Sequence, residues 1–579
     1  MKPGSRLRIP AAQAGHLLVR FRIVVTGFIL IAFVAGFLGV GRVFDGLFAS
    51  FSSVQLFPGV VGMVGTFCSD GVAALFVVSA VVTLGLIILT AVFGRFYCSS
   101  LCPLGTMQDI VSWAGHRSHR KRRGTRRFAW EPGLPFIRLA AFILVIAAFI
   151  LGAGSIAGFL DPYSQSGRFL QYTILPLVDF AGHLLAPLAR RFGLYWLRDF
   201  AAFSVWAFVA AALPVTAILI VAFFRGRLFC NTLCPVGSLL GFLNRFAPLR
   251  VRLDAGTCTA CGACARVCKA ECLDTPARTL DASRCVSCFS CLPACPASAL
   301  RYGPKPPPEP PRSESVREPT SAQAPAPSPT PASDPGRRSF LKKIGSSSVL
   351  SVMALSAPPI AGAVELLSLK PARPAPAAPP GARSLVQFQS ACTACGLCVS
   401  KCPSGVLQPS IVRYGARGFL QPYLDYEVSY CQYECTLCTD LCPTGALKRI
   451  PLEEKKLVQM GTASLVKEKC IVFTHKTACG ACAEHCPTGS VRMVPSATGI
   501  PEPEFDELIC IGCGACHHIC PALPEKSITV TGKAGQGRAL APRKDLFGLV
   551  ESPSPEGDAS AGNGKDGGKA AGAVDDFPF

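Results

Sequence analysis

The segment from Cys258 to Pro296 reads CTACGACARVCKAECLDTPARTLDASRCVSCFSCLPACP, and its cysteine spacing indicates the class of protein. It contains two successive runs of the form C-x2-C-x2-C-x3-C. Three closely spaced thiolates of such a run bind one [4Fe–4S] cluster, and the fourth cysteine ligates the other cluster. The predicted ligand sets are Cys258, Cys261, Cys264 and Cys295, and Cys285, Cys288, Cys291 and Cys268. Zinc sites instead pair C-x2-C units across a longer loop, so zinc is disfavoured.

Four further cysteine groups lie nearer the C-terminus, each with a proline directly after its fourth cysteine. Two of them depart from the regular spacing, with x3 between Cys431 and Cys435 and x8 between Cys470 and Cys479. The groups are Cys392, Cys395, Cys398 and Cys402; Cys431, Cys435, Cys438 and Cys442; Cys470, Cys479, Cys482 and Cys486; and Cys510, Cys513, Cys516 and Cys520. With the two runs above, the chain is predicted to bind six [4Fe–4S] clusters.

The composition of the chain excludes several other classes of protein. The chain has 579 residues, 30 of them cysteines, with 50% hydrophobic and 16% charged residues. Disulfide-rich secreted scaffolds are short, so this chain does not fit that class. The net charge of +21 does not indicate nucleic-acid binding, because the densest basic run, Arg117–Arg127, lies between two apolar segments. We therefore expect a membrane-bound iron–sulfur protein.

Four long uncharged segments precede the first cluster motif, and each could cross a hydrocarbon core of about 30 Å as a helix. They are Ile23–Gly41, Gly71–Gly94, Leu139–Leu160 and Phe200–Phe224. Basic residues gather before the first segment, between the second and third, and after the fourth. The positive-inside rule then places the N-terminus and the Cys258–Cys295 region in the cytoplasm of a bacterium, with the spans in the inner membrane.

An internal repeat joins the second and fourth of these segments to cysteine motifs. GRFYCSSLCPLGT at Gly94–Thr106 aligns with GRLFCNTLCPVGS at Gly226–Ser238, which predicts a doubled helix pair. The repeat carries two C-x3-C-P motifs, Cys98/Cys102 and Cys230/Cys234. These four thiols are candidates for an additional metal or redox site, or for a dithiol couple. A docking or proton- and quinol-linked role, or a structural role beside a proline turn, remains the alternative.

The second half of the chain begins with a proline-rich stretch and a short basic motif. GRRSFLK at Gly336–Lys342 precedes the uncharged segment Ile344–Val364, which resembles an internal twin-arginine export signal with a candidate cleavage site after Ala363. A fifth span is the alternative, and both carry the rest of the chain to the periplasm.

The expected architecture is multi-domain: an α-helical membrane bundle of four spans, a fifth apolar signal or anchor helix, and two α+β ferredoxin-like domains. The predicted boundaries are 1–250 for the membrane domain, 251–302 for the cytoplasmic ferredoxin, 303–336 for a Pro-rich linker, 337–364 for the signal, 365–389 for a Pro/Ala linker, 390–530 for the periplasmic four-cluster ferredoxin and 531–579 for a largely disordered tail.

Haem is not expected. Cys513 to His517 match the C-x-x-C-H attachment pattern, but both cysteines already belong to a complete cluster motif. None of the eight histidines lies inside a predicted span, so a b-type haem would lack axial ligands.

The chain as a whole resembles a natural fusion of two families. Residues 1–302 look like the NapH family, with four spans, the repeated G-R-x-[YF]-C-x-x-L-C-P-x-G segment and a two-cluster ferredoxin. Residues 337–530 look like the NapG/MauM family, with an export signal and four cluster motifs. This resemblance implies that the outer motifs exchange their fourth ligands, and the inner motifs likewise. The implied sets are Cys392, Cys395, Cys398 with Cys520; Cys510, Cys513, Cys516 with Cys402; Cys431, Cys435, Cys438 with Cys486; and Cys470, Cys479, Cys482 with Cys442.

The same resemblance implies a function. Quinol from the membrane pool would supply electrons, a periplasmic reductase or its electron-transfer subunit would accept them, and the twin-arginine machinery would be an export partner. Related C-x3-C-P membrane ferredoxins resemble assembly or maintenance factors for metal-containing oxidases and reductases, which is the alternative function. No catalytic side chain is identifiable, as expected where cofactors carry the chemistry. A core of about 30 Å would separate the two ferredoxins, and the sequence leaves open what connects them.

Overall fold

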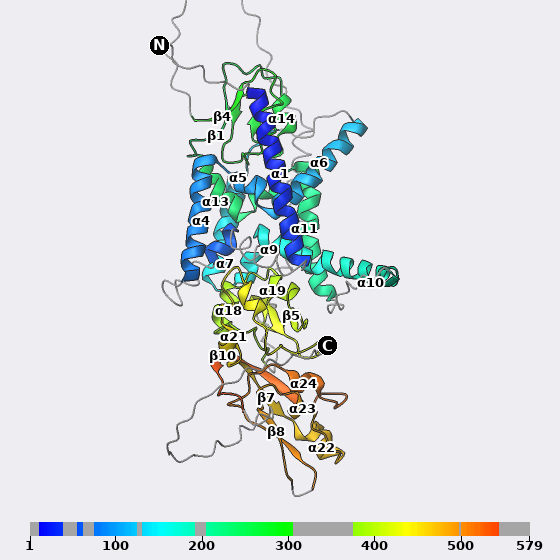
Figure 1. The fold of residues 1–579 in the computed structure, drawn as a ribbon. Coiled ribbons are helices and arrows are strands. Elements are labelled where there is room, and N and C mark those ends of the chain that lie inside the picture. Colours follow the sequence, from blue (N-terminus) through cyan, green and yellow to red (C-terminus); the bar gives the residue numbers. More distant parts are fainter. Residues whose placement is uncertain are drawn as a thin grey trace, which may run out of the picture.

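The computed structural model describes residues 11–38, 55–61, 74–123, 130–191, 204–304, 375–496 and 499–543. Figure 1 shows an elongated molecule with helices in the middle, a small region around β1 and β4 at one end, and a region running from α18 to β10 at the other. The predicted export signal at 337–364, most of the linker at 303–336, the first part of the linker at 365–389 and the chain after residue 543 lie outside the described residues.

Apolar sequence forms the central helices. Each of the four uncharged segments overlaps one helix: α1 (Ala11–Leu38), α4 (Ala74–Phe93), α7 (Pro135–Ile150) and α11 (Val205–Arg225). Among the described residues, Gly15–Phe37 and Val205–Arg225 are long and apolar enough to cross a membrane, whereas Ala80–Phe93 and Pro135–Ile150 are shorter. The expected bundle of four spans is therefore not confirmed.

The third uncharged segment, expected to be one helix over Leu139–Leu160, is broken. α7 ends at Ile150, Gly152 adopts a left-handed conformation with φ +70°, and the short α8 (Gly154–Gly158) follows. The break lets α8 pack closely against the C-terminal region. A Cβ built on Gly154 would lie 2.4 Å from the Ser390 carbonyl oxygen, and one on Gly158 would lie 2.3 Å from that of Thr393.

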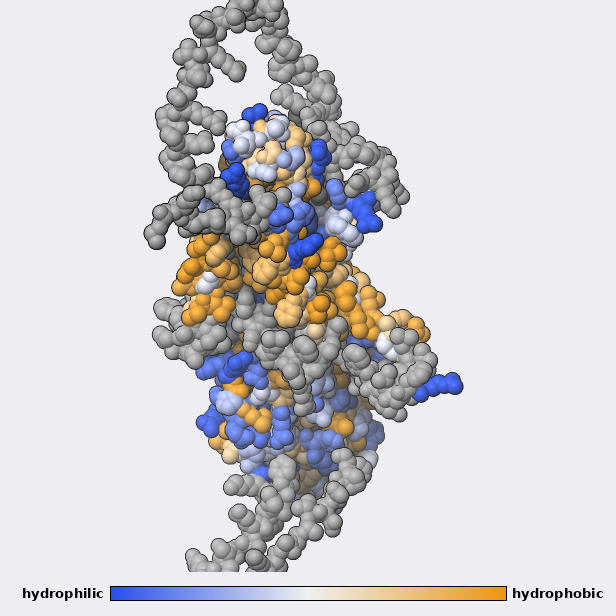
Figure 2. Space-filling view, turned by 45° about the horizontal axis from the view of Figure 1, so that its top comes forward, coloured by the Kyte–Doolittle hydropathy of each residue, from blue (hydrophilic) through white to orange (hydrophobic). Residues whose placement is uncertain are grey.

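Exposed apolar side chains form a belt across the middle of the face shown in Figure 2, between more hydrophilic ends. Its members include Phe21, Phe28, Ile31, Leu84, Ile88, Leu139, Ile143, Trp206, Leu213 and Ile220. Water-soluble proteins rarely expose a contiguous apolar surface of this extent, which marks contact with a membrane or a partner.

The sequence repeat folds as a structural repeat. α4 is followed by α5 (Phe96–Ser100) and α6 (Pro103–Arg123), and α11 by α12 (Leu228–Thr232) and α13 (Pro235–Asn244). Gly94 and Gly226 end the long helices with positive φ of +82° and +62°. The C-x3-C-P prolines begin α6 and α13, where a missing N–H costs no helical hydrogen bond.

Between α8 and α11 the chain stays helical, through α9 (Pro162–Phe169), a π-helical turn (Leu170–Ile174) and α10 (Leu175–Arg191). The Asp161 side chain caps α9 by accepting from the Ser164 backbone N–H at 2.8 Å. Figure 1 shows α10 projecting sideways from the bundle.

The first cysteine-rich region is built on two small antiparallel pairs. β1 (Arg250–Leu253) pairs with β4 (Leu300–Gly303), and β2 (Leu273–Asp274) pairs with β3 (Thr279–Leu280). α14 (Ala263–Val267) lies inside the first cysteine run. Several cysteines of this first region belong to the same buried hydrophobic cluster as the C-x3-C-P thiols, so the region packs directly on the helices.

The second cysteine-rich region is held by three antiparallel pairs. β5 (Leu407–Pro409) pairs with β6 (Pro422–Leu424), β8 (Val491–Val494) with β9 (Glu502–Phe505), and β7 (Val458–Leu465) with β10 (Ile528–Arg538). The short helices α18 (Leu385–Ala391), α19 (Leu397–Ser400), α20 (Leu437–Asp440), α22 (Ile471–Thr474), α23 (Ala481–Glu484) and α24 (Ala515–Ile519) carry or flank the cysteines.

This region extends beyond the expected limits of 390 and 530. The Gly532 N–H donates to the Ala375 carbonyl at 2.8 Å, and the Leu424 N–H donates to that of Ala377 at 3.0 Å. β10 continues past Val530 to Arg538 because it completes its pairing with β7 there.

Candidate functional site: the cysteine sets

In the first region, the fourth cysteine of each run lies near thiols of the other run, as the crossed grouping expected from the sequence requires. Burial and the nearby charges of Cys295 and Cys258 raise the pKa of the Cys264 thiol. Burial and the charges of Cys288, Cys285 and Cys268 likewise raise that of Cys291. We call these groups the first inner set (Cys258, Cys261, Cys264, Cys295) and the second inner set (Cys285, Cys288, Cys291, Cys268).

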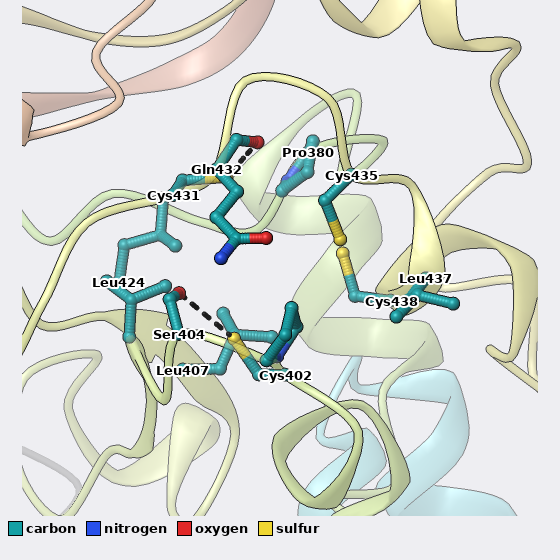
Figure 3. Close-up of a pocket in the computed structure, with 12 residues that line it drawn as sticks. Pro380, Cys402, Ser404, Leu407, Leu424, Cys431, Gln432, Cys435, Leu437 and Cys438 are labelled. Carbon is teal, nitrogen blue, oxygen red and sulfur yellow. Dashed lines mark hydrogen bonds between the residues drawn. The ribbon is translucent and has the colours of Figure 1, made fainter. Parts of the chain in front are cut away.

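Three hollows in the C-terminal region are each lined by four cysteines. One of about 350 Å³ is lined by Cys402, Cys431, Cys435 and Cys438, here called set B. Figure 3 shows these side chains, from the Cys431–Cys438 loop and from Cys402, around the hollow with Leu407 and Leu424. Another of about 350 Å³ is lined by set D (Cys470, Cys479, Cys482, Cys520) and one of about 280 Å³ by set C (Cys486, Cys510, Cys513, Cys516).

The remaining four cysteines form set A (Cys392, Cys395, Cys398, Cys442). After burial, the charge of Cys442 is among the causes that raise the pKa of each of the other three thiols. Set A therefore completes the four groups.

These groups correct the ligand exchange that the family resemblance implied. The first motif exchanges its fourth cysteine with the second, and the third with the fourth, instead of outer with outer and inner with inner. The local pairings explain this: β5 and β6 connect the first two motifs, and β8 and β9 connect the last two. Each half thereby repeats the two-run arrangement of the Cys258–Cys295 region.

The cysteine sets fit cubane clusters better than single metal ions. Within the described ranges, no three His, Cys, Asp or Glu side chains converge as one ion requires. A cubane instead presents four separate iron corners, so its thiolates surround a volume and not a point. Burial raises the pKa of Cys482 to about 11 and of Cys513 to about 12, so these thiols need bound iron to become thiolates at neutral pH.

The four outer sets lie in a row. The charge of Cys438 in set B contributes to raising the pKa of Cys398 in set A, after burial and the thiols of set A itself. The Cys431 N–H of set B donates to the Cys513 carbonyl of set C at 2.9 Å. Set C adjoins set D through α24 and α23, and α22 and α23 lie at the far tip in Figure 1. Set A is nearest the helices, where Ser164 Oγ lies 3.0 Å from Thr393 Oγ1.

The four C-x3-C-P thiols lie near one another in one buried core. Cys98, Cys102, Cys230 and Cys234, here called the quartet, are each at most 6% exposed. Burial and the charges of the other three raise the pKa of Cys234. The Gly105 N–H donates to Cys102 Sγ at 3.4 Å, and the Gly237 N–H to Cys234 Sγ at 3.3 Å, so both repeats hold their second cysteine alike.

Two buried arginines cross between the repeats. Arg95 Nη2 donates to the Cys230 carbonyl at 3.4 Å and lies 3.7 Å from Cys98 Sγ. Arg227 Nη1 donates to the Cys98 carbonyl. Burial alone would raise the pKa of Asp109, but Arg227, Lys269 and Arg22 lower it below its usual value.

Several of these residues were not selected from the sequence. Arg95 and Arg227 stand at the second position of the repeated motif, so the repeat itself carried that signal. Asp109 carries no such local signal, because its role depends on packing between segments far apart in the chain.

Comparisons with known proteins agree with these sites. Residues 75–124 and 206–253, which contain the quartet, match the family described as 4Fe-4S binding domain. Residues 378–446 and 477–523 match the family described as 4Fe-4S dicluster domain. The methylamine utilization ferredoxin-type protein MauM of Methylobacillus flagellatus is 33% identical over 186 residues, covering 30% of this chain and 76% of MauM. The chain belongs to the MauM family of ferredoxin-type proteins.

Two other relatives align with larger or similar shares of the chain. MauN of Methylobacillus flagellatus, also a methylamine utilization ferredoxin-type protein, is 26% identical over 252 residues, or 43% of this chain and 74% of MauN. YccM of Escherichia coli K12 is 26% identical over 188 residues, or 32% of this chain, and the match spans only 44% of YccM. No solved structure matches the chain. Together with its MauM-like part, these relatives identify an iron–sulfur electron-transfer protein.

Proposed function

We propose that this protein takes electrons from quinol at a membrane and delivers them, through [4Fe–4S] clusters, to a periplasmic reductase or its electron-transfer subunit. The observation that carries the proposal is the row of ligand sets leading away from the apolar belt, from set A beside α8 and α9 to set D at the tip. Such a row suits transport of electrons from a membrane to a partner beyond it.

The belt supports a membrane position for the middle of the molecule. It lies between the two cysteine-rich regions, so embedding it would place these regions on opposite sides. The basic run Arg117–Arg127 lies between the second and third uncharged segments, and the positive-inside rule favours a cytoplasmic position for it and for the first region. The C-terminal region would then be periplasmic, delivered by the predicted twin-arginine signal.

The proposed chemistry is electron transfer, in which the electrons and protons released by quinol are fully accounted for. Oxidation of one quinol to quinone releases two electrons and two protons, and each cluster, when bound, carries one electron at a time. The residues of the chain supply thiolates, exclude water and fix the spacing of the sets. The alternative role as an assembly factor does not require four sets in a row reaching beyond the belt.

Anaerobic reduction of the purified protein by a water-soluble quinol tests the proposal. We expect the visible absorption of oxidised clusters to bleach and reduced-cluster electron paramagnetic resonance signals to appear. In a Cys395→Ser variant of set A, the inner sets should still be reduced while sets B, C and D respond slowly. If dithionite reduces the clusters but excess quinol leaves all of them oxidised, quinol is not the donor.

A further inference from the structure

The quartet lies where electrons would have to pass between the two cysteine-rich regions. On one side, Arg95 Nη1 donates to the Ser283 carbonyl at 3.0 Å, and the Arg227 N–H donates to that of Lys269, next to Cys268, at 2.8 Å. On the other side, Phe169 of α9 packs against the core that contains the quartet. Ser164 and Arg168 of the same helix contact Thr393, between two cysteines of set A.

The surroundings of the quartet carry excess buried positive charge. Arg95 is fully buried and makes no ion pair among the described residues; its partners are Asn231, Ser283 and Cys230 oxygens and the Cys98 sulfur. Arg22, Arg227 and Lys269 share the single carboxylate of Asp109, at 3.1, 3.0 and 3.4 Å. Arg22 and Lys269 also act on Cys288 of the second inner set, whereas Arg95 and Arg227 contact residues of the quartet itself. Buried cations without counter-charge are strongly unfavourable, so these two arginines point to an anionic group at the quartet.

The backbone around the quartet is shaped for sulfur ligands. N–H groups of Gly105 and Gly237 point at the second sulfur of each repeat. A Cβ at Gly237 would lie 2.0 Å from the Cys230 carbonyl oxygen, and one at Gly105 would lie 2.5 Å from that of Cys98. Only glycine lets the two turns of each repeat approach in this way. The match of both segments to a 4Fe-4S binding family does not say that the two repeats share one centre.

We propose that Cys98, Cys102, Cys230 and Cys234 together bind one additional [4Fe–4S] cluster, shared between the repeats, with Arg95 and Arg227 balancing its negative charge. A cubane with four thiolates is anionic in both its oxidation states, which matches the excess of cations. The centre stands between the second inner set and set A, and it accepts one electron from one neighbour and passes one electron to the other. Only this relay role rests on the proposed function; binding of the cluster does not.

Iron and acid-labile sulfide counts test the binding without any quinol. The full chain should contain about 28 iron atoms, for seven cubanes, where six cubanes would give about 24. A Cys98→Ser/Cys230→Ser variant should lose about four iron and four sulfide and one reduced-cluster resonance, while Cys68→Ser, the matched control outside every set, should lose none. Cys261→Ser, in the first inner set, shows the size of the loss when a single cubane is removed.

The outcomes separate the alternatives. A count of about 24 iron in the full chain, zinc in place of iron, or a Cys98–Cys230 variant with unchanged iron and resonances would each overturn the proposal. Because the wild-type count needs no variant, the test stands even if the double substitution prevents folding. Arg95→Gln should make the midpoint potential of the quartet cluster more negative, because it removes a nearby positive charge. Arg95→Lys keeps the charge and should have a midpoint potential close to that of the wild type. Unchanged potentials in both variants would refute the charge argument. Failure of quinol reduction alongside a count of about 28 would refute only the proposed donor.

Discussion

Arg168 on α9 offers a sharp test of how the helices influence set A. Its guanidinium is fully buried, donates to the Gly158 carbonyl at 2.7 Å and to the Thr393 carbonyl at 3.5 Å, and lies 4.3 Å from the centre of the Phe159 ring. Thr393 stands between Cys392 and Cys395. A fixed positive charge at this position stabilises the reduced cluster, so Arg168→Gln should make the reduction potential of set A more negative.

The size of the shift follows from Coulomb's law. If the separation between the guanidinium and the cluster centre is taken as about 8 Å, with an effective dielectric constant of about 20, the lost attraction for the added electron is about 2 kcal/mol. For a one-electron couple this is roughly 90 mV. Burial raises the pKa of the neighbouring Asp161 to about 6, and the charge of Arg168 lowers it. Loss of Arg168 therefore favours protonation of Asp161, which reduces the size of the shift without reversing its direction.

Redox titration followed by electron paramagnetic resonance measures the effect. Loss of one resonance in Cys392→Ser identifies set A, and its midpoint potential is then compared between wild type, Arg168→Gln and Arg168→Lys. The lysine variant keeps the charge and should stay within about 30 mV of wild type. Equal shifts in the glutamine and lysine variants would show that Arg168 acts through packing, and a positive or negligible shift in Arg168→Gln would refute the electrostatic reasoning.

Three further changes test other parts of the structure. Gly514→Ala should destabilise the C-terminal region by about 3 kcal/mol or more and cost set C its cluster, because Gly514 has φ +82° and its Cβ would lie 1.9 Å from Tyr426. Iron counts and thermal unfolding report this, and the control is Gly535→Ala, whose Cβ would make only an ordinary contact, at 3.9 Å from the Arg383 carbonyl oxygen. Asp109→Asn should lower the free energy of unfolding in detergent by about 3–5 kcal/mol, because it leaves Arg22, Arg227 and Lys269 without their shared carboxylate. The exposed Asp254→Asn is the control and should leave that free energy unchanged. Equal effects of the two substitutions would contradict the shared ion pair. Protease added to spheroplasts should digest the 390–530 region and spare the Cys258–Cys295 region, and protection of both would overturn the proposed topology.

Sequence spacing determined those features that depend on only a few neighbouring residues. Three thiolates within seven residues, as in Cys258 to Cys264, must lie on one loop, so each motif could be recognised without the fold. The repeat of Gly94–Thr106 at Gly226–Ser238 likewise predicted two equivalent turns, because both copies carry the same glycine, cysteine and proline positions, which impose the same glycine break and proline start.

Tertiary structure decided which distant segments meet. The fourth cysteine of each outer set comes from another motif, and its choice depended on the pairing of β5 with β6 and β8 with β9, which no local spacing encodes. The end of α7 at Ile150 depended on Gly154 and Gly158 packing against residues 390–393. Long-range contacts of this kind are set by the burial of surfaces from separate segments, so only the folded chain shows Arg95 and Arg227 facing thiols of the opposite repeat.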